Sequence, residues 1–266
     1  MRHEPRRAVR ASALALLATV GAGPALAQSA WDLSAGAMHR QLVERAVDGS
    51  RLVKESGPML RLAAGRSFAL ANGGALRADF GVAGGELDYE GRTQAGEPLA
   101  TDSRHRDIDA TLAWRPWPSA SWGEAWLVLR AVQQRREIAS TPTVGGLDET
   151  STLLLPGLRW SHAFTAGSWN WRPALELRSS VWHRLDVDYR GVFDSQDLHG
   201  GHRNEFVLGV EAAAAASPWS WSLEWTRARQ QASERDTLRR GGVAIGTVVQ
   251  PRIEIDDVML RVRRAF

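Results

Sequence analysis

Histidines and carboxylates gather at the ends of two long polar stretches of this 266-residue chain. A carboxylate beside a histidine can polarise a water molecule or bind a metal ion, so chemistry is most to be expected there. The two most closely spaced pairs are Asp107 with Asp109 and Asp197 with His199. The further candidates are His105, His183, Asp186, Asp188, His202 and Glu205.

Other arrangements are less suited to chemistry. His199-Gly200-Gly201-His202 has residues for a metal site, but a glycine loop with solvated histidines is the simpler interpretation, and we predict no metal and no cofactor. Ser161 and His162 are adjacent, so on a strand they point to opposite faces and cannot pair directly.

The elements that must position these residues are strands, as the last segment indicates. In Arg252–Phe266 the apolar Val258, Leu260, Val262 and Phe266 share one face, while Met259, Arg261, Arg263 and Ala265 share the other. This period-2 alternation runs to the final residue, which predicts a strand that ends on an aromatic side chain.

The same alternation recurs along the chain and predicts ten strands. Short turns at 72–74, 116–119, 165–168 and 216–218 alternate with a link near Asp48 and long links at 89–104, 140–149, 190–202 and 232–242. An even number of strands with this alternation predicts an all-β, ten-stranded antiparallel up-and-down transmembrane β-barrel. The predicted strands are Trp31–Arg40, Pro58–Phe68, Leu76–Gly85, Asp107–Arg115, Ala125–Gln134, Thr152–Phe164, Trp169–Val181, Glu205–Ala214, Trp219–Thr226 and Arg252–Phe266.

The tryptophans favour a membrane barrel over a soluble one with an apolar core. Eight of them flank the four short turns, and tryptophan prefers a membrane–water interface because its ring is apolar while its N–H seeks a partner. They predict a girdle at the periplasmic rim. They are Trp114, Trp117, Trp122, Trp160, Trp169, Trp171, Trp219 and Trp221.

The second face of the strands carries arginines and carboxylates in nearly equal number. In a ten-stranded barrel this face points inward and side chains largely fill the lumen, so we expect a plug of ion pairs. A narrow channel is the alternative. Pro156 is an irregularity, because proline cannot donate to a strand ladder.

The first 27 residues have the pattern of a secretory signal peptide, with arginines, a short apolar core and Ala25-Leu26-Ala27. We therefore predict a mature barrel at 28–266, exported through the general secretory pathway to the Gram-negative outer membrane. The segment accounts for the whole formal net charge of +3. The mature chain is formally neutral, so nucleic acid is not an expected partner.

The terminal Phe266 strand resembles the closing strand of bacterial outer-membrane β-barrels, which implies recognition by the barrel-assembly machinery. The strand count resembles the omptins, ten-stranded outer-membrane proteases with an Asp pair and an Asp–His pair. That resemblance implies a protease using Asp107, Asp109, Asp197 and His199. Outer-membrane phospholipases and lipid A deacylases share a His-x-Ser pairing, which the sequence lacks.

The combined expectation is a monomeric outer-membrane barrel with a salt-bridged, plugged interior that acts as a non-enzymatic surface or envelope protein. An omptin-like protease and a narrow channel remain the alternatives. The expected partners are membrane lipids and lipopolysaccharide, whose phosphates Arg135-Arg136 and Arg239-Arg240 would meet at the outer rim.

Overall fold

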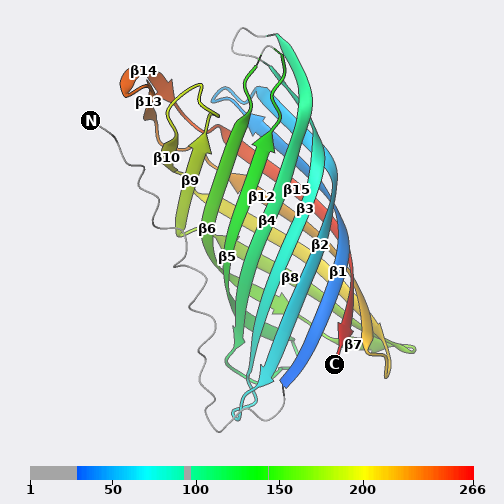
Figure 1. Ribbon diagram of the computed structural model, residues 1–266. Helices are drawn as coiled ribbons and strands as arrows, with labels where there is room; N and C mark the ends of the chain where they lie inside the picture. Colours follow the sequence, from blue (N-terminus) through cyan, green and yellow to red (C-terminus); the bar gives the residue numbers. More distant parts are fainter. Residues whose placement is uncertain (1–28, 93–96, 143) are drawn as a thin grey trace.

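The computed structural model describes residues 29–92, 97–142 and 144–266, and they form a closed antiparallel β-barrel (Figure 1). Each strand of the wall pairs antiparallel with the next wall strand along the chain, and β1 closes the ring by pairing with β15 from Asp32↔Ala265 to Arg45↔Arg252. The main wall strands are β1 (Ser29–Arg45), β2 (Arg51–Ala69), β3 (Ala75–Arg92), β4 (Pro98–Arg115), β5 (Glu124–Ile138), β6 (Leu147–Ser161), β8 (Trp169–Ser179), β9 (Trp182–Asp188), β11 (Arg203–Ala214), β12 (Trp219–Gln230) and β15 (Arg252–Ala265).

Short strands complete the wall and one outer hairpin. β8 and β9 follow each other along β6 and form one interrupted wall strand, and β10 (Gln196–His199) precedes β11 in the same way, which gives ten wall strands. β7 (Phe164–Ala166) extends the turn between β6 and β8. β13 (Asp236–Arg240) and β14 (Val243–Val248) form a separate hairpin in the link between β12 and β15. The predicted fold class and strand order are confirmed.

The strands are longer than the apolar pattern predicted. The stretch 89–104, expected as a polar link, is largely strand, because β3 continues to Arg92 and β4 begins at Pro98. The link near Asp48 is a tight turn in which Ala46 N donates to Ser50 O. Backbone pairing continues where the side chains have become polar, which alternation of apolar residues cannot reveal.

Pro156 lies at a β-bulge between β6 and the interrupted wall strand. The β6–β8 ladder ends at Gly157↔Arg178, and the β6–β9 ladder begins at Leu154↔Trp182. Two residues of β6 therefore face three residues, 179–181, of the other strand, which is the pattern of a bulge. Proline is tolerated there because the ladder is already interrupted.

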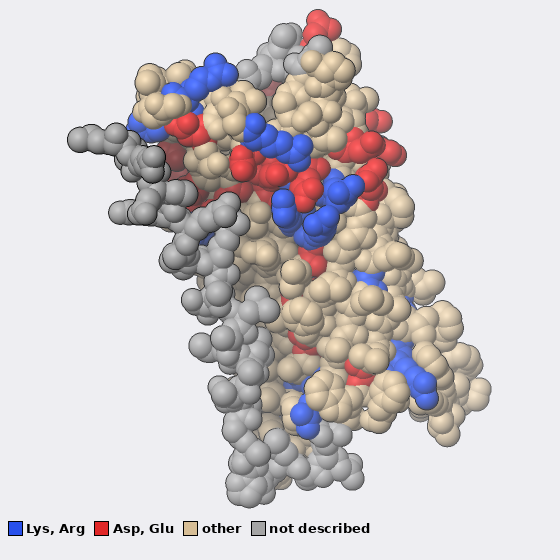
Figure 2. All heavy atoms as spheres, in the orientation of Figure 1, with Lys and Arg blue, Asp and Glu red and all other residues tan. Residues whose placement is uncertain are grey.

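The outer surface has two zones, which we call the belt and the collar. The belt is apolar and exposed, and it contains Leu33, Leu60, Leu62, Phe80, Val82, Ile108, Leu127, Leu129, Leu158, Leu177, Leu208, Leu223, Val258 and Leu260. The collar lies above it, where the outward residues become charged, including Glu86, Arg104, Arg106, Arg135, Arg184, Arg227, Arg229 and Asp256. Figure 2 shows the charged side chains concentrated in the upper part of one face, above a largely uncharged wall.

The lower edge of the belt carries the exposed tryptophans beside the short turns, including Trp114, Trp117, Trp122, Trp169 and Trp219. This placement fits the predicted girdle. Within the described residues, no helix is long and apolar enough to cross a membrane. The predicted signal peptide at 1–27 lies outside the described residues.

Candidate functional site

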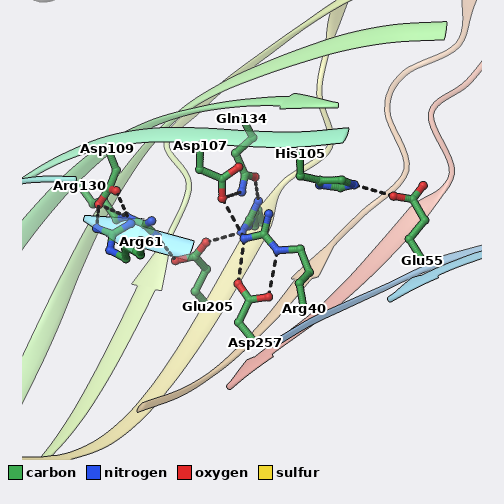
Figure 3. A network of polar contacts seen from close by, with 11 residues as sticks. Arg40, Glu55, Arg61, His105, Asp107, Asp109, Arg130, Gln134, Glu205 and Asp257 are labelled. Carbon is green, nitrogen blue, oxygen red and sulfur yellow. Dashed lines mark hydrogen bonds and ion pairs between the residues drawn. The ribbon is translucent and has the colours of Figure 1, made fainter. Parts of the chain in front are cut away.

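The interior at mid-height holds an ion-pair network that joins distant strands (Figure 3). Arg40 of β1 donates to Asp107 of β4 at 2.8 Å and to both oxygens of Asp257 on β15 at 2.9 Å. These residues lie inside because their strand positions alternate with belt residues. A guanidinium can bridge two carboxylates since it carries five donors in one plane.

Two further carboxylates extend the network across the lumen. Asp109 lies 2.7 Å from Arg61 and 3.4 Å from Arg130. Glu205 of β11, whose side chain is fully buried, lies 2.7 Å from Arg203, 3.1 Å from Arg178 and 3.4 Å from Arg130. Arg130 therefore connects the carboxylate of β4 with that of β11, and side chains span the barrel at this height.

A second cluster lies above it, at the height of the collar. Arg136 of β5 pairs with Glu44, Glu55 and Glu149, and His105 Nε2 lies 2.6 Å from Glu55 Oε2. Arg104 and Arg106 flank His105 in β4, and Arg135 precedes Arg136 in β5. All three point outward into the collar, so this cluster lies above the belt.

The electrostatics of Glu55 follow from this arrangement. Burial acts to raise the pKa of its carboxyl group, but the charge of Arg136 and the hydrogen bond with His105 outweigh it and hold the pKa at about 2. Glu55 is therefore ionised at neutral pH. Burial also raises the pKa of the nearby Tyr89 to about 12.

The lower interior is also paired but more open. Arg77 lies 2.8 Å from Asp32 and 2.5 Å from Asp79, and Arg263 pairs with Glu211. A cavity of about 160 Å³ lies among the charged side chains of the middle and lower interior. This space accommodates several water molecules among groups that can bond them.

The four residues proposed for protease chemistry are not brought together. Asp107 and Asp109 are buried in the interior and bound to arginines. Asp197 and His199 lie on the outer face of β10, because the Leu198 between them is buried inside, and Asp197 pairs with Arg184 at 2.8 Å. The barrel wall thus separates the two pairs.

The other candidates also have partners. His183 is buried, with Nδ1 2.9 Å from Gly201 O and Nε2 3.3 Å from Ser151 Oγ. His105 and Glu205 belong to the interior clusters, Asp186 pairs with Arg184 at 3.0 Å, and Arg190 N donates to the Asp188 carboxylate. His202 contacts Ser179. Among the described residues, no group of three or more ligands is placed to hold a metal ion.

Several interior residues were not identified from the sequence. Arg40, Glu44, Glu55, Arg136 and Glu149 lie at strand ends or in stretches expected as links. The sequence signal that could have identified them is the two-residue period itself. It continues above the belt, where successive charged residues point alternately inward and outward. One expectation is corrected: Arg136 points inward, so only Arg135 of that pair reaches the collar.

The fold of the chain is similar to that of known outer-membrane proteins. No family model matches the chain, and no curated protein matches it either. Among solved structures, the chain is similar to the outer membrane protease OmpT from Escherichia coli, with a TM-score of 0.50 and 11% identity over 91% of this chain and 97% of that one.

Two other barrels show lower similarity. The translocator domain of the autotransporter NalP from Neisseria meningitidis matches 89% of this chain and 88% of its own at 8% identity and a TM-score of 0.49. An outer membrane channel from Pseudomonas putida F1 matches 93% and 100% at 11% identity and a TM-score of 0.40. At 11% identity, the similarity to OmpT shows the fold alone, which is that of an outer-membrane β-barrel.

Proposed function

We propose that the chain is an integral outer-membrane barrel whose interior is sealed by ion pairs. It acts through its outer surface and extracellular links as a surface or envelope protein. In this proposal it neither cleaves peptides in a groove nor conducts ions through a pore. The observation that carries this proposal is the mid-height network of Arg40, Arg130, Asp107, Asp109 and Glu205, in which side chains from opposite walls meet.

The belt supports the membrane location. Large apolar side chains on the outside are favourable only where water is absent, and Leu60 is 72% exposed and Leu158 is 62% exposed. A closed sheet also pairs every strand edge, as a bilayer requires. The chain accordingly reaches the outer membrane by export and is folded there by the barrel-assembly machinery acting on the strand that ends in Phe266.

The charges at mid-height support a seal because each carboxylate there, Asp107, Asp109, Glu205 and Asp257, has at least one arginine partner. Opening the lumen would break several buried ion pairs at once, and leaving a buried charge without its partner costs about 3–5 kcal/mol. The cavity of about 160 Å³ among the described residues favours the alternative of a narrow channel.

Single-channel recording in planar bilayers tests the proposal. The refolded protein is expected to show no steady conductance, whereas simultaneous replacement of Arg40, Arg130 and Arg203 by alanine should produce steady channels by emptying the middle of the lumen. Leu208→Ala, on the belt, is the matched control and should stay silent. Steady conductance of the unmodified barrel would contradict the seal and favour the narrow channel.

The protease alternative has its own test. The refolded protein is incubated with dibasic peptides, and no cleavage is expected because Asp109 is engaged by Arg61 and Arg130. Cleavage that Asp109→Ala abolishes would overturn the proposal in favour of the omptin-like enzyme.

A further inference from the structure

The outer wall brings together a serine and a histidine from neighbouring strands. Ser179 Oγ at the end of β8 lies 2.9 Å from Nε2 of His202, just before β11, and 2.7 Å from Oδ1 of Asn204. His202 and Asn204 are exposed and Ser179 is partly exposed. A serine hydroxyl within hydrogen-bond distance of an imidazole nitrogen is the nucleophile–base pair of acyl transfer.

The register of the sheet fixes this arrangement. Asn204 pairs with Ser179 on one side and with Arg229 on the other, so the three lie in one outward row. The row below consists of Leu177, Phe206 and Arg227 in the same order. The bulge at 179–181 begins at Ser179, and bulges re-aim side chains from a sheet.

An apolar groove of about 620 Å³ lies beside the serine on the outer surface. Pro156, Leu158, Leu177 and Phe206 supply its apolar lining, while Ser179 and Asn204 also border it. Leu158 and Leu177 are more than half exposed, at 62% and 54%, so the groove is open to a ligand from the membrane side. Its apolar lining suits a hydrocarbon chain.

Two arginines, Arg227 and Arg229, border the same groove. Arg227 lies 4.0 Å from Asp256, and its buried Nε has no hydrogen-bond partner among the residues described. In the described part of the chain, Arg229 makes no ion pair. Arg229 is exposed and the side chain of Arg227 is 38% exposed, so a phosphate can reach both guanidinium groups, and a guanidinium binds phosphate with two parallel hydrogen bonds.

Ser179 lies at the height above the girdle where the ester groups of a lipid leaflet are expected. Ten residues separate Ser179 from Trp169 in the girdle, which at the usual rise and tilt of barrel strands is roughly 25 Å. This distance is about the height of the apolar band of such barrels. Ser179 therefore lies where acyl chains end and head groups begin.

We propose that Ser179 and His202 form an esterase site for an acyl ester whose head carries a phosphate. His202 Nε2 takes the hydroxyl proton as Ser179 Oγ attacks the ester carbonyl carbon. The bond to the leaving alcohol breaks, and His202 returns the proton to that oxygen. Water then attacks the acyl-serine, its proton passes to His202 and then to Ser179 Oγ, and a fatty acid leaves.

The orientation of the Asn204 side-chain amide determines which acceptor the hydroxyl of Ser179 donates to. With its oxygen beside Ser179, the amide competes with His202 for that proton. A turn about the Cβ–Cγ bond puts the NH2 group there instead, and the hydroxyl proton is then left to His202. In that orientation the amide can also donate to the oxyanion that forms on the ester.

The test uses the full refolded barrel with two substrates, phosphatidylglycerol vesicles and lipopolysaccharide, and measures released fatty acid by mass spectrometry. We expect release from at least one substrate, and which one identifies the source of the ester. Ser179→Ala should lower the rate by at least about 10³-fold, as loss of a nucleophile does. Thr152→Ala on the outer face of β6 is the matched control and should keep the unmodified rate.

A fluorophosphonate probe provides a second readout that does not depend on the choice of lipid substrate. It should label the unmodified barrel at Ser179, and His202→Ala should abolish labelling with the circular dichroism spectrum unchanged. No labelling and no release from either substrate would overturn the proposal, as would full activity of Ser179→Ala. The inference rests on the proposed membrane location but not on the sealed interior, so the conductance test can fail independently.

Discussion

At the scale of single residues, the interior depends on guanidinium groups that each serve several carboxylates. Arg136 forms ion pairs with Glu44, Glu55 and Glu149. Arg40 forms ion pairs with two further carboxylates from different strands. The chemistry favours arginine because its planar fork forms directed pairs and loses less freedom than lysine for each hydrogen bond made. The packing of the interior therefore depends on which carboxylates each arginine binds.

Loss of Glu205 should be strongly destabilising. Three arginines lie within 3.4 Å of its carboxylate, so Glu205→Ala leaves buried positive charge uncompensated. We expect a loss of about 3–5 kcal/mol in the free energy of unfolding, measured by urea titration in detergent micelles. Glu86→Ala, whose side chain is 58% exposed in the collar, should change it by no more than about 0.5 kcal/mol. Equal effects of the two variants would refute the network's role.

The depressed pKa of Glu55 predicts a specific pH dependence. Its pKa is about 2 in the folded barrel against an ordinary 4.5, so its stabilising effect is fully present above pH 4.5 and disappears as the pH falls through 2. The unfolding free energies of the unmodified protein and Glu55→Gln should differ by about 3 kcal/mol at pH 7 and converge near pH 2. A difference that persists undiminished at pH 2 would rule this out.

At the scale of elements, the alternation of apolar residues predicted the belt-level part of every wall strand. Leu127 and Leu129 point outward and Arg130 inward as expected. The upper strand ends could not be predicted in this way, because both faces there are polar and the outward residues are no longer apolar, although the strands continue. The sequence located Asp107 but not its partner Arg40. It also missed the contact between Ser179 and His202, because that contact depends on the register between strands.

The break between β10 and β11 requires glycine at Gly201. A Cβ added there would lie 1.9 Å from the backbone oxygen of Gln231, and backbone cannot move aside as a flexible side chain can. Gly201→Ala should therefore lower the free energy of unfolding by about 1–3 kcal/mol. Gly246→Ala in β14 meets nothing within 4 Å and should be nearly neutral in the same urea titration. A neutral Gly201→Ala would show that the break can shift.

At the scale of the whole molecule, the barrel is divided by height. The tryptophan girdle marks one end, the belt follows, and the collar with the β13–β14 hairpin marks the other (Figure 1, Figure 2). The end of β15 also fits this division, because the guanidinium of Arg264 lies 5.3 Å from the Trp219 ring and 4.9 Å from the Phe266 ring. A cation at the lower edge can thus remain near water while its guanidinium group lies over aromatic rings.

The central claim is that the belt faces lipid, and fluorescence quenching tests it most directly. The chain has no cysteine, so a bimane label can be placed on one introduced cysteine at a time. In vesicles of brominated phospholipid, labels at Leu208, Leu223 and Leu260 should be strongly quenched, whereas labels at Glu86 and Arg135 in the collar should not. Equal quenching in belt and collar, or none in either, would contradict the membrane barrel.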